Sequence, residues 1–221
     1  SENRQFNLSV QKSQSKRQDV MTIDALFEKL KHPNPNLRKK AMWEIAEARD
    51  ENTIPYLMSV LGQEDVTFRR AAVKTLGVIG ADVVPPVVES LLNNANPTVR
   101  SSCAKVLAQI AVNHPDVPMP EEGIQGLKQA LEDPNPVVNI PAVMTLGEIG
   151  SPVFELLVET LNTTDNIVVQ MSIINALGSM GDARGMEVLT NLSQDKSADP
   201  YLQESATSAL SRLEMVIKYN S

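Results

Sequence analysis

The sequence has few of the residues that build covalent, metal or aromatic sites. Its 221 residues include one cysteine and two histidines, and aromatic residues make up 4%. A single cysteine excludes a disulfide framework within the chain, a CxxC redox motif and a zinc site built from several thiolates. The scarcity of aromatic residues argues against an aromatic-rich sandwich and favours thin layers of small helices.

Long apolar runs and an excess of positive charge are also missing. No run of about 18 apolar residues occurs, which argues against a transmembrane helix, and the first residues lack the apolar core of a secretory signal. With 20 Lys+Arg against 27 Asp+Glu, the formal net charge is −7, so nucleic acid is a poor candidate partner. We therefore expect a cytoplasmic protein that binds neither membranes nor nucleic acid.

What the chain does contain is an internal repeat. Turns rich in Pro, Asn and Asp precede stretches of small and apolar residues, and four of these stretches end alike, at Leu76–Gly80, Leu107–Ala111, Leu146–Gly150 and Leu177–Gly181. One residue two positions after each turn serves as the anchor of its unit. The anchors recur at intervals of 31, 31, 39, 31 and 33 residues, at Arg38, Arg69, Arg100, Asn139, Gln170 and Gln203. The long interval indicates an eight-residue insert at 113–120.

Each unit predicts two helices. Helix A carries apolar residues at helical period, as in Ile23–Leu30. Pro ends it, Asn or Asp caps helix B, and Gly in the αL conformation ends helix B. One pair cannot bury its apolar face alone, so about six pairs should stack into an all-α solenoid over residues 22–221. The polar residues 1–21 predict a disordered or frayed N-terminal arm.

These residues resemble HEAT repeats, specifically the short HEAT-like repeat of the phycobilin lyase (E/F-type) superfamily. The segment Ala176–Leu189 is closest to that repeat, and the resemblance covers about residues 22–216. It implies a cyanobacterial protein that attaches, transfers or detaches a linear tetrapyrrole of a phycobiliprotein; the solitary branch detaches bilins during phycobilisome breakdown. The bilin, such as phycocyanobilin, would be a transient ligand, and we expect no permanently bound cofactor and no metal.

The constant offsets also sort helix B into faces. At about 100° per residue, offsets +3, +7 and +10 from the anchor point to the core, and +1, +5 and +8 point away from it. The resemblance implies that this second face lines the concave side of the solenoid. Small residues at +8 would let a partner approach the backbone. The predicted binding residues at +1 and +5, here called the ridge residues, are basic or aromatic in units 1–3 and apolar in units 4–5: Lys39, Trp43, Arg70, Lys74, Lys105, Ile140, Met144 and Met171.

Such a ridge suits a bilin, which combines two propionates with a long apolar π-system. No pair of carboxylates at a fixed spacing suggests acid–base catalysis, and Cys103 falls at core offset +3. Catalysis therefore stays open, and so does the alternative of a non-catalytic adaptor, for example to an iron–sulfur cluster assembly scaffold. A DNA glycosylase of HEAT type, using the basic residues and Trp43, is a remote alternative because the net charge is negative.

Three further features of the sequence lead to predictions. The insert at 113–120 predicts either surface lengthening or a contact loop. Pro141, within helix B of the fourth unit, predicts a bend or a delayed helix start. The resemblance implies that the arginine anchors bond carboxylates or carbonyls of adjacent units.

Overall fold

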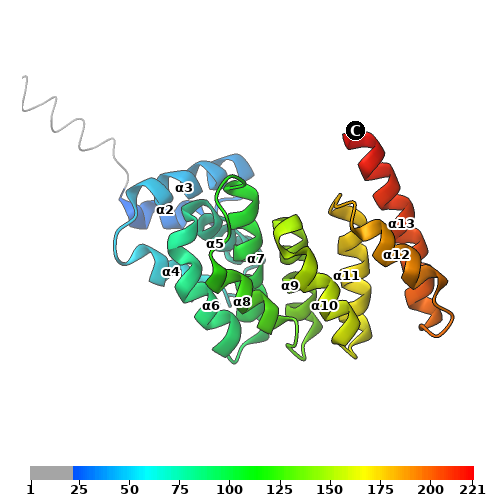
Figure 1. Ribbon diagram of the computed structural model, residues 1–221. Coiled ribbons are helices and arrows are strands. Elements are labelled where there is room, and N and C mark those ends of the chain that lie inside the picture. Colours follow the sequence, from blue (N-terminus) through cyan, green and yellow to red (C-terminus); the bar gives the residue numbers. More distant parts are fainter. Residues whose placement is uncertain (1–21) are drawn as a thin grey trace, which may run out of the picture.

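Six helix pairs follow one another along residues 22–221, the part of the chain that the computed structural model describes (Figure 1). The first helices of the pairs, the A helices, are α2 (Ile23–Lys29), α4 (Thr53–Val60), α6 (Val84–Asn93), α8 (Glu121–Ala130), α10 (Phe154–Thr163) and α12 (Gly185–Gln194). The second, the B helices, are α3 (Pro35–Ala48), α5 (Val66–Ile79), α7 (Pro97–Asn113), α9 (Pro136–Ile149), α11 (Ile167–Ser179) and α13 (Pro200–Asn220). The 3-10 helices η1 (Ala81–Val83) and η2 (Ser151–Val153) precede α6 and α10. The predicted all-α solenoid is confirmed, and the predicted arm at 1–21 lies outside the described residues.

A capping residue precedes every B helix, as the sequence of the turns predicted. An Asn or Asp side chain accepts a hydrogen bond from a backbone N–H two or three residues further on. This bond satisfies one of the donors that a helix N-terminus leaves free. The capping residues are Asn34, Asp65, Asn96, Asn135, Asn166 and Asp199.

The anchor residues tie down the turn of their own unit. Each side chain donates to a backbone carbonyl five or six residues earlier, for example Arg38 Nη1 to the His32 carbonyl at 2.7 Å and Asn139 Nδ2 to the Asp133 carbonyl at 2.9 Å. The same bond recurs at the other four anchors, Arg69, Arg100, Gln170 and Gln203. The expected bonds to adjacent units were wrong for Arg38 and Arg69, because the first turn of helix B faces the turn that precedes it, but the expectation is confirmed for Arg100. Among the anchors of residues 22–221, Arg100 alone also reaches the next unit.

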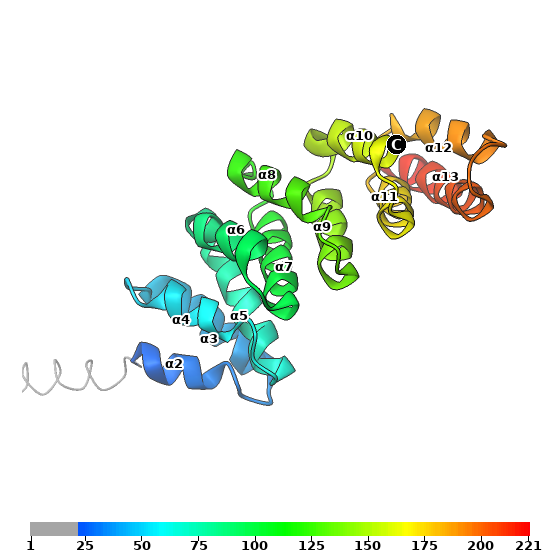
Figure 2. The same ribbon diagram turned by 90° about the horizontal axis from the view of Figure 1, so that it is seen from below.

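The B helices form the inner, concave layer of the curved array, and the A helices form the outer layer (Figure 2). Each B helix packs against the B helix of the next unit. The core lies between the layers, and two of the three predicted core offsets, +3 and +7, lie in it. Buried residues at these offsets are Ala41, Ala72, Cys103, Ala142 and Ala206 at +3, and Ile45, Leu76, Leu107, Leu146 and Leu177 at +7. The third offset, +10, is buried at Ile79, Ile110 and Leu213 but not at Ala48, Ile149 and Met180, so that prediction was right for only half of the units.

The irregular features keep their predicted places but not all their predicted conformations. Gly80 and Gly150 end their helices with φ of 94° and 83°, but ψ of −144° and −139° places them outside the αL region that we expected. Helix α9 begins at Pro136, so Pro141 does not delay its start. The insert separates α7 from α8, and His114 Nε2 lies 3.1 Å from the Val78 carbonyl oxygen.

Within residues 22–221, no single helix has the length and apolarity needed to cross a membrane. In this range only the helical segments Val66–Ile79 and Ala81–Asn93, taken together, are long and apolar enough, and the angle between them is 115°.

Candidate ligand groove on the concave face

The four basic ridge residues lie exposed on successive B helices. Lys39 is on α3, Arg70 and Lys74 are on α5, and Lys105 is on α7. In the part of the chain that the structure describes, no carboxylate lies within 4.0 Å of any of them. Trp43, on α3, has 48% of its surface exposed. Units 1–3 therefore present free positive charge and one large aromatic ring on the inner layer.

The three apolar ridge residues come together in a groove between α9 and α11. Its larger part has a volume of about 590 Å³. The residues that line this part include Ile140 and Met144 of α9, Asn175 of α11 and Met180, the C-cap of α11. A second part, of about 380 Å³, shares Ile140 and Asn175 and adds Met171. The shared residues make the two parts one groove that runs along α11.

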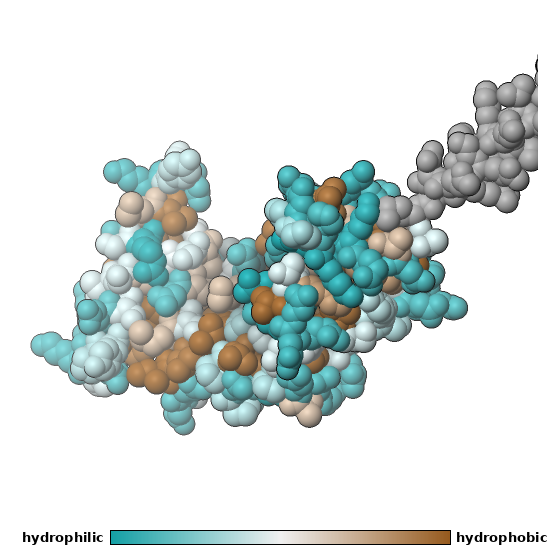
Figure 3. All heavy atoms as spheres, turned by 180° about the vertical axis from the view of Figure 1, so that it is seen from behind, coloured by the Kyte–Doolittle hydropathy of each residue, from teal (hydrophilic) through white to brown (hydrophobic). Residues whose placement is uncertain are grey.

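Exposed apolar side chains extend this groove toward the N-terminal ends of the B helices. Val137 of α9 and Ile167 and Val168 of α11 are 50%, 43% and 38% exposed, and Tyr201 of α13 is 71% exposed. Figure 3 shows the concave side, where apolar residues gather along the lower edge of the C-terminal half while hydrophilic residues dominate the N-terminal half. An exposed apolar band of this kind typically marks a contact surface.

Three of these residues were not predicted from the sequence, although their position in the repeat indicated which way they point. Val137, Val168 and Tyr201 all lie two positions before their anchors, at offset −2. By helical phase, this offset points in nearly the same direction as +5. The corresponding residues of units 1–3 are Asn36, Thr67 and Thr98, so offset −2 is apolar only in the second half of the array.

Arg212 reaches the groove from α13 and was also missed. Its Nη2 donates to Asn175 Oδ1 at 3.3 Å. A Cβ atom at Gly178 would lie 2.9 Å from the same nitrogen, so the absence of a side chain there makes room for the guanidinium. Because Asn175 lines both parts of the groove, this contact places a positive charge at its edge.

The expectation that small residues at offset +8 let a partner approach the backbone is wrong for three of the six units. Ala46, Gly77 and Gly178 are buried. A Cβ at Gly77 would lie 2.3 Å from Gln109 Cβ, so the neighbouring helix α7 occupies this space. Gly147 differs, because a Cβ there would meet Ala176 Cβ at an ordinary 3.4 Å and because Gly147 lines the groove. The α9–α11 contact is therefore looser at this offset than the α5–α7 contact.

The groove is chemically simple. Its carboxylate is that of Glu148, which lies among apolar side chains, two serines and Asn175. Cys103 is fully buried, and burial, with a smaller contribution from the charge of Glu89, raises the pKa of its thiol to about 12. The thiol therefore stays protonated at neutral pH and is no nucleophile. Within residues 22–221, no three His, Cys, Asp or Glu side chains are grouped so that they could hold a metal ion.

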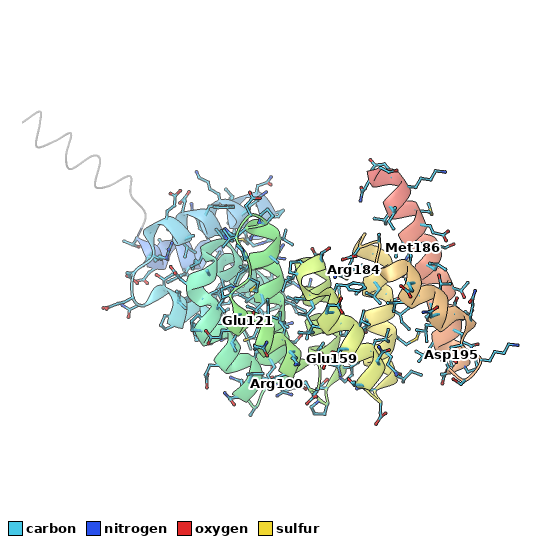
Figure 4. The ribbon with its side chains drawn as sticks, in the orientation of Figure 1. Arg100, Glu121, Glu159, Arg184, Met186 and Asp195 are labelled. Carbon is cyan, nitrogen blue, oxygen red and sulfur yellow. The ribbon has the colours of Figure 1, made fainter. Side chains whose placement is uncertain are left out.

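Ion pairs join neighbouring units. Arg100 Nε lies 2.8 Å from Asp133 Oδ2, and both side chains are mostly buried. Arg184, labelled in Figure 4, lies 3.5 Å from Glu155 and 4.3 Å from the centre of the Phe154 ring, both in the fifth unit, and 2.7 Å from Asp182, two residues before it. The hydrogen bond from Arg184 lowers the pKa of Asp182 to about 2. Arg100 thus connects the third unit to the fourth, and Arg184 connects the fifth to the sixth.

Comparisons with known proteins identify the repeat and its relatives. The family of HEAT repeats matches residues 23–116 and 124–211. The chain is 57% identical over 196 residues to the "Uncharacterized phycocyanin operon protein Z" of Pseudanabaena tenuis (strain PCC 7409), which covers 89% of this chain and 97% of the relative. It is 34% identical over 168 residues to the "Bilin biosynthesis protein CpeZ" of Synechococcus sp. (strain WH8020), covering 73% of this chain and 90% of the relative.

Two solved structures are similar to this chain at low sequence identity. A chain in the structure titled "Structural Basis of Microtubule Plus End Tracking by XMAP215, CLIP-170 and EB1" is 18% identical, with a TM-score of 0.50 over 88% of this chain and 94% of that chain. The complex of CpcE and CpcF of phycocyanin lyase from Nostoc sp. PCC7120 gives 18% identity and a TM-score of 0.46 over 70% of this chain and 96% of that one. The first of these likenesses shows the fold alone.

Proposed function

Because the chain belongs to the HEAT-repeat proteins of the phycobilin lyase type, we propose that its concave face binds a phycobiliprotein and receives the linear tetrapyrrole of that protein. The observation that carries this proposal is the groove between α9 and α11, which continues the row of free cations on α3, α5 and α7. A relative is named a bilin biosynthesis protein, which makes a bilin the first ligand to test.

The size and lining of the groove support a bilin as its ligand. A volume of about 590 Å³ falls within the ~300–1,000 Å³ that is usual for small-molecule sites. Methionine and isoleucine side chains present polarizable, apolar surfaces to a conjugated chain. Asn175 and Glu148 supply the few polar groups that such sites use to fix orientation.

The free cations suit the protein partner and the anionic groups of the chromophore. Lys39, Arg70, Lys74 and Lys105 attract an acidic surface over a distance set by the ionic strength. Because Cys103 is buried and protonated, we propose that the thiol that forms the bond to the tetrapyrrole belongs to a cysteine of the phycobiliprotein. This chain then acts by holding chromophore and protein in a fixed orientation.

The test is a titration of a pigmented phycobiliprotein with the purified chain, followed by visible absorbance and by co-elution on a sizing column. We expect co-elution together with a shifted or bleached band. The variant Met144→Lys, which places a charge in the groove, should reduce the spectral change. Lys128→Gln, a change on the outer helix α8, should leave it unaltered.

An adaptor is the second candidate, since the single cysteine of the chain, Cys103, is buried. Co-elution with an unchanged spectrum would favour the adaptor over a chain that acts on the chromophore. If neither co-elution nor a spectral change occurred, the proposal would be wrong. The search would then turn to other protein partners, such as an iron–sulfur cluster assembly scaffold.

A further inference from the structure

Arg212 is held at the edge of the groove with an unusual partner. Among the arginines of residues 22–221, Arg49, Arg100 and Arg184 pair with carboxylates, and two anchor arginines donate to backbone carbonyls. Arg212 donates to a neutral side-chain amide oxygen, that of Asn175, at 3.3 Å. No carboxylate of these residues lies within 4.0 Å of its guanidinium.

The surroundings of Arg212 hold its guanidinium across the neighbouring helix. The side chain starts on α13 and crosses over Gly178 of α11, where a Cβ would lie only 2.9 Å from Nη2. Asn175 fixes the far end of the side chain and lines both parts of the groove. A guanidinium carries five N–H donors, so the single bond to Asn175 leaves donors for a further acceptor.

The groove itself is polar at one end and apolar at the other. Glu148 and Ser179 lie in the larger part, Ile167, Val168 and Tyr201 lie in the smaller part, and Asn175 lines both. The 13 residues of α11 span about 20 Å at ~1.5 Å per residue. An elongated ligand with anionic groups on an apolar body therefore matches the groove in one direction.

We propose that Arg212 binds a carboxylate of the linear tetrapyrrole and that the conjugated chain extends along α11 toward Tyr201. The inference rests on the proposed function and names a residue that orients the ligand. Arginine suits this role because its planar fork matches the two oxygens of a carboxylate. Glu148 stands on the α9 side of the same part of the groove and repels a carboxylate, so the carboxylate should lie on the α11 side, next to Arg212.

The experiment titrates the purified chain with phycocyanobilin, once as the free acid and once as its dimethyl ester, and follows visible absorbance. The variants are Arg212→Gln, Arg212→Lys and the control Lys128→Gln on the outer helix α8. We expect Arg212→Gln to weaken binding of the free acid about tenfold, a loss typical of one charge-assisted hydrogen bond. The ester should bind the parent chain and Arg212→Gln equally, and Lys128→Gln should behave like the parent chain.

The variant Asn175→Ala tests the same proposal in the same titration while keeping the guanidinium of Arg212. It should weaken binding of the free acid by a smaller factor, about threefold, because the arginine is no longer held in place. Arg212→Lys should fall between the parent chain and Arg212→Gln, since a lysine keeps the charge but loses the fork.

Three results would overturn the inference. One is equal binding of acid and ester by the parent chain, and another is equal binding of the acid by the parent chain and Arg212→Gln. The third is failure of the free tetrapyrrole to bind while an acidic peptide binds in an Arg212-dependent way, which would assign the residue to a protein partner. None of these results decides the proposed function, which the separate titration with phycobiliprotein tests.

Discussion

The two halves of the concave face are built on the same repeat but carry opposite chemistry. Units 1–3 have arginine at every anchor and free lysine or arginine on the ridge, whereas units 4–6 have Asn139, Gln170 and Gln203 as anchors and apolar residues on the ridge of α9 and α11. All six anchors make the same bond to their own turn. The repeat therefore needs only a side-chain N–H at the anchor, and the charge is free to vary with function.

The α9–α11 contact also differs from the α5–α7 contact in how closely the inner helices pack. At Gly77 the α5–α7 contact leaves no room for a methyl group, while at Gly147 the α9–α11 contact leaves ordinary van der Waals space. The groove lies where the contact is looser. Spacing between two B helices, as well as residue type, thus decides which half can receive a small molecule.

We expect the largest loss of stability from removing the ion pair that joins the third unit to the fourth, and so the two halves. Arg100→Ala removes the partner of Asp133, whose side chain is only 10% exposed, and leaves a nearly buried carboxylate unpaired. We expect the free energy of unfolding to fall by about 2–3 kcal/mol, measured by urea denaturation. The matched change Arg49→Ala removes an exposed pair and should cost less than about 0.5 kcal/mol. Equal losses would show that burial of the pair is unimportant.

The difference in packing can be tested with one methyl group in each half. Gly77→Ala forces its Cβ against Gln109 and should destabilise the fold by about 1–3 kcal/mol. Gly147→Ala should be neutral or stabilising by up to about 1 kcal/mol, because alanine favours a helix and the site has room. The measurement is again urea denaturation. If the two variants lost the same stability, the proposed difference in spacing would be wrong.

The difference in charge can be tested by reversing it. The triple variant Lys39→Glu, Arg70→Glu and Lys74→Glu should weaken binding of an acidic partner at least tenfold, about 1.4 kcal/mol, at low salt. The loss should shrink at high ionic strength because these side chains are exposed. Circular dichroism should show an unchanged fold. Unaltered binding by a folded triple variant would remove the basic half from the contact surface.

The smallest effect should appear at the connection between units 5 and 6, and it should depend on pH. Arg184 lowers the pKa of Asp182 to about 2 from an unperturbed 3.8. The folded state is thus stabilised fully above pH 3.8, and this contribution is lost as the pH falls through about 2. Asp182→Asn should cost below about 1 kcal/mol at pH 7, given the exposure of Arg184. Thermal unfolding at pH 7 and at pH 2 should show the gap between parent and variant closing; a constant gap would contradict the assignment.

Repeat spacing was enough to predict much of this molecule. It located six helix pairs, the insert at 113–120 and the core offsets +3 and +7, because each unit repeats a local pattern of cap and apolar face. Helical phase also brought Ile140, Met144 and Met171 into one groove. Statements about neighbours held only in part: the small residues at +8 and the partners of the anchors both depend on how closely the next segment approaches.

The sequence by itself therefore determined the solenoid, its family and the contrast between a basic and an apolar half. These follow from local preferences and from periodicity, which each unit carries within itself. Only the tertiary structure decided that a groove opens at α9–α11 and that Arg212 of α13 reaches it over Gly178. Such features depend on distances of a few tenths of an ångström between helices, which are set by packing along the whole array rather than by any one repeat.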